Sequence, residues 1–303
     1  MQQQRLIGKT LKEAWHKRLG YLFLLPYAAS FSVFVVAPVV ISLFYSFTYY
    51  NILQPPKFIG LRNYINLLLA DDVFLIAVKN TFVFAVITGP LGYFASFIFA
   101  WFIYEIPARI RSFVILVFYA PSISGSVYVL WALIFSGDAY GYINGMLMRL
   151  GIINGPVLWL TDPKYMMTVV IIVILWMSLG TGFLAFVAGL ATVDETLYEA
   201  GLVDGISNRW QELWFITLPN MKGMLFFGAV MAITGSFGVG GVGAALAGFP
   251  STDYAVHTVM NHLDDYGTLR FEMGYASAIA TLLFLVALLS KSLVQRLLNR
   301  VGT

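Results

Sequence analysis

The side chains that could do catalytic or metal chemistry are few and poorly placed for it. The chain has no cysteine and three histidines, of which His257 and His262 stand five residues apart near Asp264 and Asp265. That spacing matches no usual zinc-binding pattern, so we expect a solvated loop there and no metal site. Adjacent carboxylates usually point apart, so we expect solvated surface at each such pair and no catalytic residue. The pairs are Asp71 with Asp72, Asp194 with Glu195, and Asp264 with Asp265.

Nucleotide chemistry is equally unsupported within this chain. A phosphate-binding loop needs glycines whose backbone N–H groups cradle phosphates, followed by a lysine that neutralises them. The nearest match is Gly8-Lys9-Thr10, but Gln3 occupies the position of the first glycine and no strand pattern precedes it. If ATP drives this protein, another chain binds it. We therefore expect no cofactor and no enzymatic activity in this chain, with ATP and magnesium held by a partner.

Apolar segments make up most of the sequence. Of its residues, 59% are hydrophobic and 11% charged, and the mean hydropathy is +0.81, whereas a soluble domain carries about 25% charged residues. Six stretches are long enough to cross a bilayer core about 30 Å thick, and each must be helical because lipid cannot satisfy unpaired backbone groups. They are residues 21–47, 80–104, 112–135, 165–190, 223–247 and 273–290. The sequence predicts an all-α integral membrane protein with six transmembrane helices.

These six stretches contain no Asp, Glu, Lys, Arg or His. Proton-coupled carriers and pumps keep ionisable relays in the membrane despite an insertion cost of about 2.5–3.5 kcal/mol per residue, so direct proton coupling is disfavoured. No filter motif or ring of charges indicates an ion channel. A secondary carrier or channel stays the alternative class, which co-purification of a separate ATPase would exclude.

The basic residues predict the orientation. With the N-terminus inside, the cytoplasmic segments hold roughly twice as many Lys and Arg residues as the external ones, and basic loops are retained in the cytoplasm. We predict both termini in the cytoplasm, an uncleaved cytoplasmic segment 1–20, one transmembrane domain 21–298 with a cytoplasmic loop 191–222, and a cytoplasmic tail 299–303. The net charge of +3 is scattered in short clusters, so we expect no nucleic-acid partner.

The loop 191–222 is the most polar stretch between two apolar segments. Asp194 or Thr196 can cap a helix, and Gly205 permits the positive φ that ends it. A second segment rich in tryptophan and phenylalanine follows, and Pro219 precedes the next apolar stretch. The pattern predicts a compact helix–turn–helix knob exposed to the cytoplasm.

The spacing within this loop resembles a known motif. Glu199-Ala200-Gly201, then Gly205 and Ile216-Thr217-Leu218-Pro219, is similar to the EAA loop of binding-protein-dependent ABC importer permeases, although Gly201 stands where alanine is usual and one extra residue separates Gly205 from Ile216. The resemblance implies a type I importer permease fold, alternating access, and a loop that docks into a cleft on an ATPase subunit. The residues it assigns to ATPase coupling are Glu199, Ala200, Gly201, Asp204, Gly205 and Pro219.

Other motifs resemble the carbohydrate branch of that family, similar to the maltose and multiple-sugar systems. They are Phe58, Gly60, Leu61, Asn63, Tyr64, Phe74, Asn80-Thr81 and the segment 273–278, while the glycine-rich segment 235–248 departs from the usual Gly-Gly-Pro. The resemblance implies four partners besides membrane lipid and the sugar: a second permease subunit in a heterodimer, two ATP-binding cassette subunits, and an extracytoplasmic solute-binding protein. It also implies the bacterial cytoplasmic membrane as location.

Spans without charge suit a neutral polar solute held by hydroxyls and aromatic faces. We expect a sugar or oligosaccharide. Charged solutes such as glycerol phosphate or a polyamine are the alternative, disfavoured because no countercharge stands in the spans. The candidate residues of the substrate path are Trp176, Ser178, Thr181, Thr234, Ser236 and Phe237, each of which could instead serve helix packing.

Overall fold

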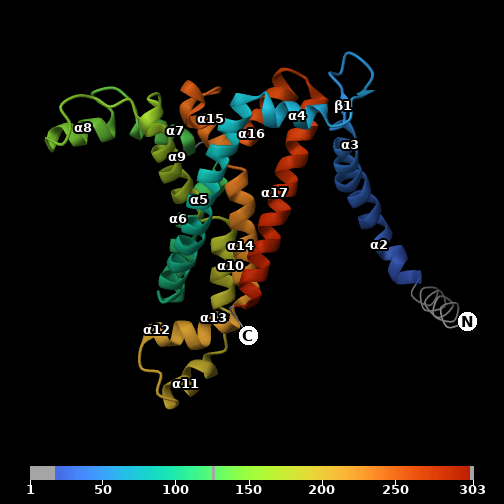
Figure 1. Ribbon diagram of the computed structural model, residues 1–303. Helices are drawn as coiled ribbons and strands as arrows, with labels where there is room; N and C mark the ends of the chain where they lie inside the picture. Colours follow the sequence, from blue (N-terminus) through green and yellow to red (C-terminus); the bar gives the residue numbers. More distant parts are fainter. Residues whose placement is uncertain (1–17, 125–126, 301–303) are drawn as a thin grey trace, which may run out of the picture.

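A computed structural model describes residues 18–124 and 127–300 of the chain. These residues are almost entirely helical (Figure 1). The elements are α2 (Arg18–Phe31), η1 (Ser32–Val36), α3 (Ala37–Tyr45), β1 (Thr48–Tyr49), β2 (Lys57–Phe58), α4 (Arg62–Leu69), α5 (Asp72–Tyr104), α6 (Ala108–Ile123), α7 (Val127–Ile134), α8 (Tyr142–Arg149), α9 (Pro163–Met177), α10 (Thr181–Leu190), α11 (Glu195–Val203), α12 (Arg209–Glu212), η2 (Leu213–Thr217), α13 (Leu218–Asn220), α14 (Lys222–Phe237), α15 (Gly240–Ala247), η3 (Thr252–Tyr254), α16 (Val259–Asp264), η4 (Asp265–Leu269) and α17 (Met273–Arg300). Elements η1, η2 and η4 are π-helical turns, and η3 is a 3₁₀ turn.

The number of spans agrees with the prediction. Four helical segments of the described chain are long and apolar enough to cross a membrane, namely Leu22–Tyr45, Asp72–Tyr104, Pro163–Leu190 and Met273–Arg296. Two bent pairs also qualify when each pair is taken together: α6 with α7, and Arg209–Asn220 with α14, the latter bent by 83°. The described residues therefore hold four to six candidate spans, in keeping with the six predicted, and the all-helical membrane fold is confirmed.

Three predicted spans are nevertheless not single helices. The predicted span 165–190 breaks at residues 178–180 between α9 and α10, and 223–247 breaks at 238–239 between α14 and α15. The span 112–135 is divided between α6 and α7. Serine and glycine stand at these helix breaks. They barely lower the mean hydropathy of the surrounding stretch, so a long apolar run does not reveal where its helix is interrupted. Irregular backbone within a span is tolerated where it faces protein or a cavity.

The second span begins earlier than the predicted residue 80. Asp71 caps α5 by accepting a hydrogen bond from the Phe74 backbone N–H at 2.9 Å. The polar first turns of α5 carry Asp72, Lys79 and Asn80, which hide the helix from a hydropathy search. Asn80 is buried and donates to the backbone carbonyls of Tyr254 and His257, both at 2.9 Å.

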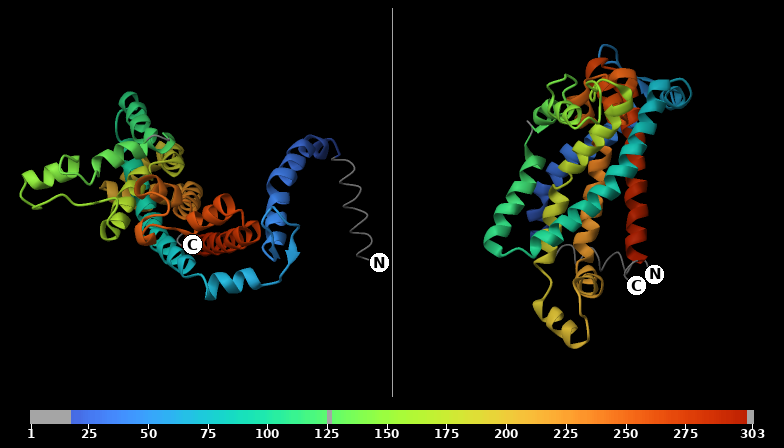
Figure 2. Two further views of the ribbon diagram at one scale, coloured as in Figure 1. Left: turned by 90° about the horizontal axis from the view of Figure 1, so that it is seen from above. Right: turned by 90° about the vertical axis from the view of Figure 1, so that its left-hand side faces the viewer.

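The bundle has two distinct ends, called lower and upper as drawn in Figure 1. The segment α11–α13 lies at the lower end, together with the start of α2 and the end of α17 (Figures 1 and 2). The hairpin β1–β2, α4, α8 and α16 lie at the upper end. This common side for the first and last helix ends and for loop 191–222 agrees with the predicted topology; which face of the membrane each end meets stays a prediction.

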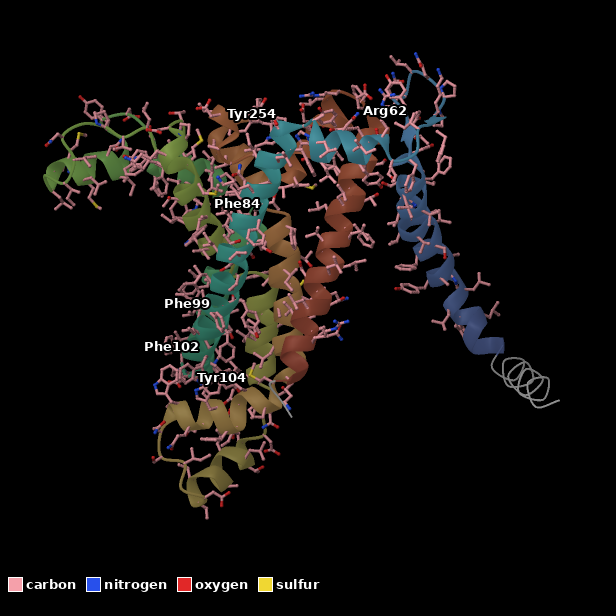
Figure 3. All side chains as sticks on the ribbon, viewed as in Figure 1. Arg62, Phe84, Phe99, Phe102, Tyr104 and Tyr254 are labelled. Atoms are coloured by element: carbon pink, nitrogen blue, oxygen red, sulfur yellow. The ribbon has the colours of Figure 1, made fainter. Side chains whose placement is uncertain are left out.

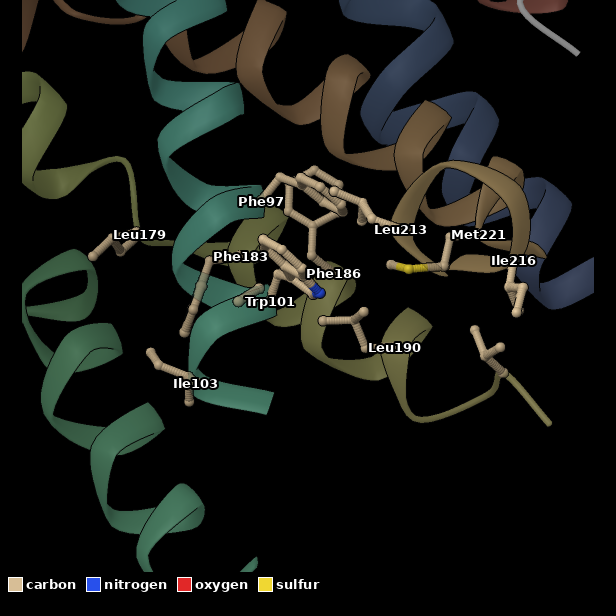
Figure 4. Packing of buried hydrophobic residues seen from close by; sticks show 12 residues of the cluster. Phe97, Trp101, Ile103, Leu179, Phe183, Phe186, Leu190, Leu213, Ile216 and Met221 are labelled. Carbon is tan, nitrogen blue, oxygen red and sulfur yellow. The ribbon is translucent and has the colours of Figure 1, made fainter. Parts of the chain in front are cut away.

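One hydrophobic cluster joins the lower half of the bundle to the segment α11–α13 (Figure 4). Phe186 on α10 packs edge-on against Tyr93 and Phe97 of α5, with ring centroids 5.4 and 5.5 Å apart. Leu213 and Ile216 of η2 belong to the same cluster. In contrast, none of the apolar window within Leu22–Tyr45 is buried, and α2 diverges from the other spans (Figure 2).

Candidate functional site

The segment 191–222 forms the predicted helix–turn–helix. Asp194 caps α11 by accepting from the Thr196 N–H at 3.0 Å, and this hydrogen bond lowers the pKa of the Asp194 carboxyl. Gly205 follows α11 with φ +94°, in the left-handed region where a side chain is strained. Asn208 then caps α12 by accepting from the Gln211 N–H at 3.0 Å. Each helix limit is therefore fixed by a local hydrogen bond or by a glycine.

The two legs of this segment touch at Gly201. A Cβ on Gly201 would lie 2.7 Å from Ile216 Cδ1, closer than carbon atoms approach, and 3.1 Å from Ile206 Cδ1, a tight contact. Above this contact, the hydroxyls of Tyr198 and Thr217 are hydrogen-bonded at 2.9 Å. The glycine thus allows α11 to lie directly against η2, and an alanine at this position would require the side chains of Ile216 and Ile206 to shift.

The outer surface of the segment combines charged and apolar side chains. Among the predicted coupling residues, Glu199, Ala200, Asp204, Gly205 and Pro219 are exposed and Gly201 is buried. Beside them stand exposed large apolar residues: Leu202, Val203 at 88% exposure, Trp210, Trp214 and Phe215 at 71%. Such a patch outside the spans is typical of a protein–protein contact. The coupling role of these residues stays a prediction.

The segment is also attached to the lower end of α5, a contact that the sequence analysis missed. Trp210 packs on Trp101 with ring centroids 5.2 Å apart. Arg209 lies 3.6 Å from the Glu105 carboxylate and 2.9 Å from that of Glu212. Figure 3 shows α5 crossing the bundle and ending at Tyr104, beside this segment. A displacement of α12 would therefore disturb its contacts with the lower end of α5.

The predicted path residues divide between three places. Ser178, Thr181 and Ser236 line one cavity of about 260 Å³ between α5, α10 and α14. Thr234 and Phe237 face a different depression between α14 and α17. Trp176 lines neither and packs edge-on against Trp131, with ring centroids 5.2 Å apart. The structure therefore brings together three of the six candidates.

Glycine and aliphatic residues make up most of the cavity lining, with several hydroxyl-bearing residues and the Phe186 ring among them, and none of the described residues that line it is charged. Thr88, Gly92 and Ser96 of α5 line it, and Ser96 Oγ donates to the carbonyl of Ser178 at 2.9 Å, across the break between α9 and α10. These three residues, which the sequence analysis missed, recur every four positions and so share one helix face. That spacing was the signal in the sequence that could have found them.

Comparison with known proteins identifies the chain. The family described as "Binding-protein-dependent transport system inner membrane component" matches residues 106–302. The chain belongs to this family. Relatives include the probable ABC transporter permease protein YesP of Bacillus subtilis (strain 168), 33% identical over 88% of this chain and 86% of that protein. The lactose transport system permease protein LacF of Rhizobium radiobacter is 32% identical over 72% of each chain. The arabinooligosaccharides transport system permease protein AraP of Bacillus subtilis (strain 168) is 28% identical over 90% of this chain and 86% of that protein.

Solved structures show the same fold. A chain of a bacterial ABC transporter involved in the import of the acidic polysaccharide alginate superposes with a TM-score of 0.77 at 24% identity, covering 97% of the permease and 100% of that chain. A chain of the alginate transporter in complex with an alginate pentasaccharide-bound periplasmic protein gives 0.79 at 23% identity, covering 96% and 98%. The multi-pass permease fold is thereby established.

At the upper end of the permease, the structure contradicts one expectation from the sequence. His257 and His262, expected in a solvated loop, are only 3% and 2% exposed. His262 Nε2 lies 3.0 Å from Asp71 Oδ2, which also accepts from the Tyr275 hydroxyl at 2.9 Å, and His262 Nδ1 lies 3.4 Å from His257 Nε2. The expectation that Asp71 is solvated was also wrong, because α16 folds back over the start of α5 and covers Asp71.

Burial lowers the pKa of His257 to about 4, with a further contribution from the adjacent His262. Burial also lowers the pKa of His262, although Asp71 opposes that shift. Both imidazoles are therefore neutral at pH 7. Within the described residues, no group of three or more carboxylate and imidazole side chains is arranged to hold a metal ion. The hydrogen bonds of Asp71 with His262 and Tyr275 join the start of α5 to α16 and α17.

Proposed function

We propose that this permease carries a neutral sugar or oligosaccharide into the cell by alternating access, driven by ATP hydrolysis on separate subunits. The observation that carries the choice of solute is the uncharged cavity lined by Ser96, Ser178, Thr181 and Ser236. Hydroxyls there can hydrogen-bond to a polyol, whereas a phosphate or an ammonium group would lose its hydration without gaining a countercharge. The lactose and arabinooligosaccharide permeases among the relatives support the same class of solute.

The segment α11–α13, called the coupling segment from here on, supports the proposal that separate subunits drive transport with ATP. Glu199, Ala200, Asp204 and Gly205 are presented to solvent on α11 and its C-terminal turn, where an ATP-binding cassette subunit can contact them. Gly201 keeps α11 against η2, and Pro219 begins the connection to α14. The permease itself does no covalent chemistry and holds no cofactor; ATP and magnesium belong to the two cassette subunits.

A single helix connects the coupling segment to the cavity. The lower end of α5 contacts Arg209 and Trp210, and its middle supplies Thr88 and Ser96 to the cavity lining. A movement of α12 can therefore change the access of the cavity through α5. This connection gives alternating access a physical route within the permease.

The unburied first span supports a partner permease. Apolar residues of Leu22–Tyr45 that do not pack within the chain are satisfied by lipid or by a second permease subunit. We place the assembly in the bacterial cytoplasmic membrane, with α11–α13 in the cytoplasm and the upper end facing an extracytoplasmic solute-binding protein.

Isolation of the native importer tests this assembly. The tagged permease, purified in mild detergent, is expected to retain a second permease, an ATP-binding cassette protein and a solute-binding protein in the mass spectrum. A glycan array probed with that solute-binding protein should then return neutral saccharides. Recovery of the permease alone would reject the assembly, and selective binding of a phosphorylated solute or a polyamine by the recovered solute-binding protein would reject the neutral sugar.

A further inference from the structure

A long apolar groove runs between α5 and α17. Its floor is α14, which lies between these two helices (Figure 1), and its volume is about 630 Å³. The wall on α5 extends from Phe74 to Phe94, and the wall on α17 extends from Leu282 to Val294. None of the described residues that line it is charged. We call this cavity the α5–α17 groove.

The groove is open on its outer side. Five of its apolar side chains are between 47% and 68% exposed, namely Phe82, Val86 and Phe94 of α5 and Val286 and Leu293 of α17. These residues belong to two of the membrane-spanning helices. The groove is therefore accessible to the hydrocarbon part of the bilayer.

The polar groups of the groove are largely occupied by the backbone. The Ser236 hydroxyl donates to the Ile233 carbonyl at 2.8 Å, and the Tyr93 hydroxyl donates to the Leu225 carbonyl at 3.4 Å. Thr81 Oγ1 accepts from the Val259 N–H at 2.9 Å. Few hydrogen-bonding groups are left for an occupant, so the groove suits a hydrocarbon chain and not a sugar.

The cross-section of the groove decides between a lipid chain and a protein helix. At about 1.5 Å per helical residue, the wall is about 18 Å long on α17 and about 30 Å long on α5, so the volume of about 630 Å³ divided by these lengths gives about 35 and 21 Å². A helix about 10 Å wide needs about 80 Å². A hydrocarbon chain that touches its neighbours at about 4 Å occupies about 20 Å². The groove therefore holds one or two acyl chains and does not admit a helix.

The lower mouth of the groove is basic. Leu293 and Val294 are the last residues of α17 that line it, and Lys291 and Arg296 stand exposed beside them. Neither cation forms an ion pair within the part of the chain that the structure describes. The sequences of α14 and α17 contain no Asp or Glu. Basic sites between spans on the cytoplasmic side attract anionic lipid headgroups.

We propose that the α5–α17 groove binds one anionic phospholipid, with its acyl chains in the groove and its phosphate beside Lys291 and Arg296. The lipid comes from the cytoplasmic leaflet, and this choice of leaflet rests on the proposed function, which places the lower end in the cytoplasm. Tyr93 and Ser236 line both the groove and the proposed sugar cavity. The bound chains thus support the contact between α5 and α14 from the membrane side.

Native mass spectrometry of the complete importer tests the site. The delipidated complex is titrated with dioleoylphosphatidylglycerol, which is anionic, or with the zwitterionic dioleoylphosphatidylcholine. Val86→Trp and Val286→Trp fill the groove from opposite walls, and each should weaken binding of one phosphatidylglycerol about tenfold. Val117→Trp is the matched control, because Val117 is 52% exposed on α6 and lies outside the groove. Each variant should still retain the ATP-binding cassette subunits, which shows that it is folded.

The headgroup is tested with charge variants. Lys291→Gln and Arg296→Gln should each weaken phosphatidylglycerol binding about fivefold and leave phosphatidylcholine binding unchanged. Arg149→Gln, at an exposed position of α8 at the upper end, is the control and should bind both lipids as the wild type does.

Three results would overturn the site. Unchanged phosphatidylglycerol binding in both groove variants, or an equal loss in Val117→Trp, would place the lipid elsewhere. Equal affinity of the wild type for the two lipids would remove the anionic headgroup. Crosslinks from a photoreactive side chain at position 86 to the second permease, and none to lipid, would assign the groove to a protein contact. These measurements involve no transport, so the lipid site can fail while ATP-driven uptake of a sugar stands.

Discussion

At the scale of the residue, Gly205 and Glu199 carry the most specific expectation for the coupling segment. Valine at position 205 must adopt the left-handed φ of +94° at a cost of about 1–2 kcal/mol or redirect α12. A charged hydrogen bond from Glu199 to the cassette subunit is worth about 1.5–3 kcal/mol, or at least tenfold in affinity. We expect Gly205→Val and Glu199→Ala to insert normally, to lose substrate-stimulated ATP hydrolysis at least tenfold and to stop uptake. Gly155→Val, in open space at the other end, is the control; normal stimulated hydrolysis in both coupling variants would contradict the assignment.

Also at the residue scale, His257 and His262 make the stability of the permease depend on pH. Folding lowers the pKa values of both imidazoles, to about 4 for His257. Below about pH 6.5 the unfolded chain therefore binds protons at these histidines that the folded chain does not bind. Stability is therefore constant near neutrality and falls as the pH drops from about 6.5 to 4. Tm, measured in nanodiscs, should decrease by several degrees over this interval. His257→Gln keeps the Nε2 donor but cannot titrate, and its Tm profile should be flatter; an unchanged slope would contradict this origin.

At the scale of the element, the contact between α12 and α5 predicts an order of effects. The Arg209–Glu105 pair is 64% and 40% exposed, and such surface pairs contribute at most about 1 kcal/mol. Trp210 is itself 62% exposed, but its ring contacts the buried Trp101, and this apolar contact is not screened by salt, so we expect it to contribute more to the link than the ion pair does. Trp210→Ala is expected to reduce substrate-stimulated ATP hydrolysis more than Arg209→Ala does, and Trp210→Phe should restore part of it. Equal effects of the two alanine variants would show that the ion pair carries the coupling.

The elements also show what the sequence can and cannot predict. Long apolar runs gave the six spans, and the polar loop with Gly205 gave the α11–α12 turn, because hydropathy and a positive φ are local properties. The break at residues 178–180 and the burial of His262 depend on helices that pack from distant parts of the chain. Asp71 and Tyr275 are 204 residues apart and meet only after folding. Three of the six predicted path residues line one cavity and Trp176 packs on Trp131, and the substrate-path role of all six stays a prediction.

At the scale of the whole molecule, the predicted orientation can be read with single cysteines, since the chain contains none. A cysteine at Ser207 in the coupling segment should be protected from an impermeant thiol reagent in intact cells and labelled after permeabilisation. A cysteine at Gln54, exposed in the hairpin loop at the opposite end, should be labelled in both conditions. Labelling of Ser207→Cys from outside would show that the topology is the reverse of the predicted one, on which the coupling role depends.

We expect this permease to import a neutral sugar with energy from ATP that is bound by its partner subunits. Uptake of the saccharide bound by the solute-binding protein, measured in proteoliposomes that contain the complete importer, tests it most directly. The predicted spans contain no ionisable residue, and in the observed helices Asp72 and Lys79 of α5 and Lys291 of α17 stand toward the helix ends, so we expect no proton relay through the spans. Uptake should therefore require ATP and the solute-binding protein, and a protonophore should leave it unchanged. Uptake that persists without ATP and collapses with the protonophore would contradict the account.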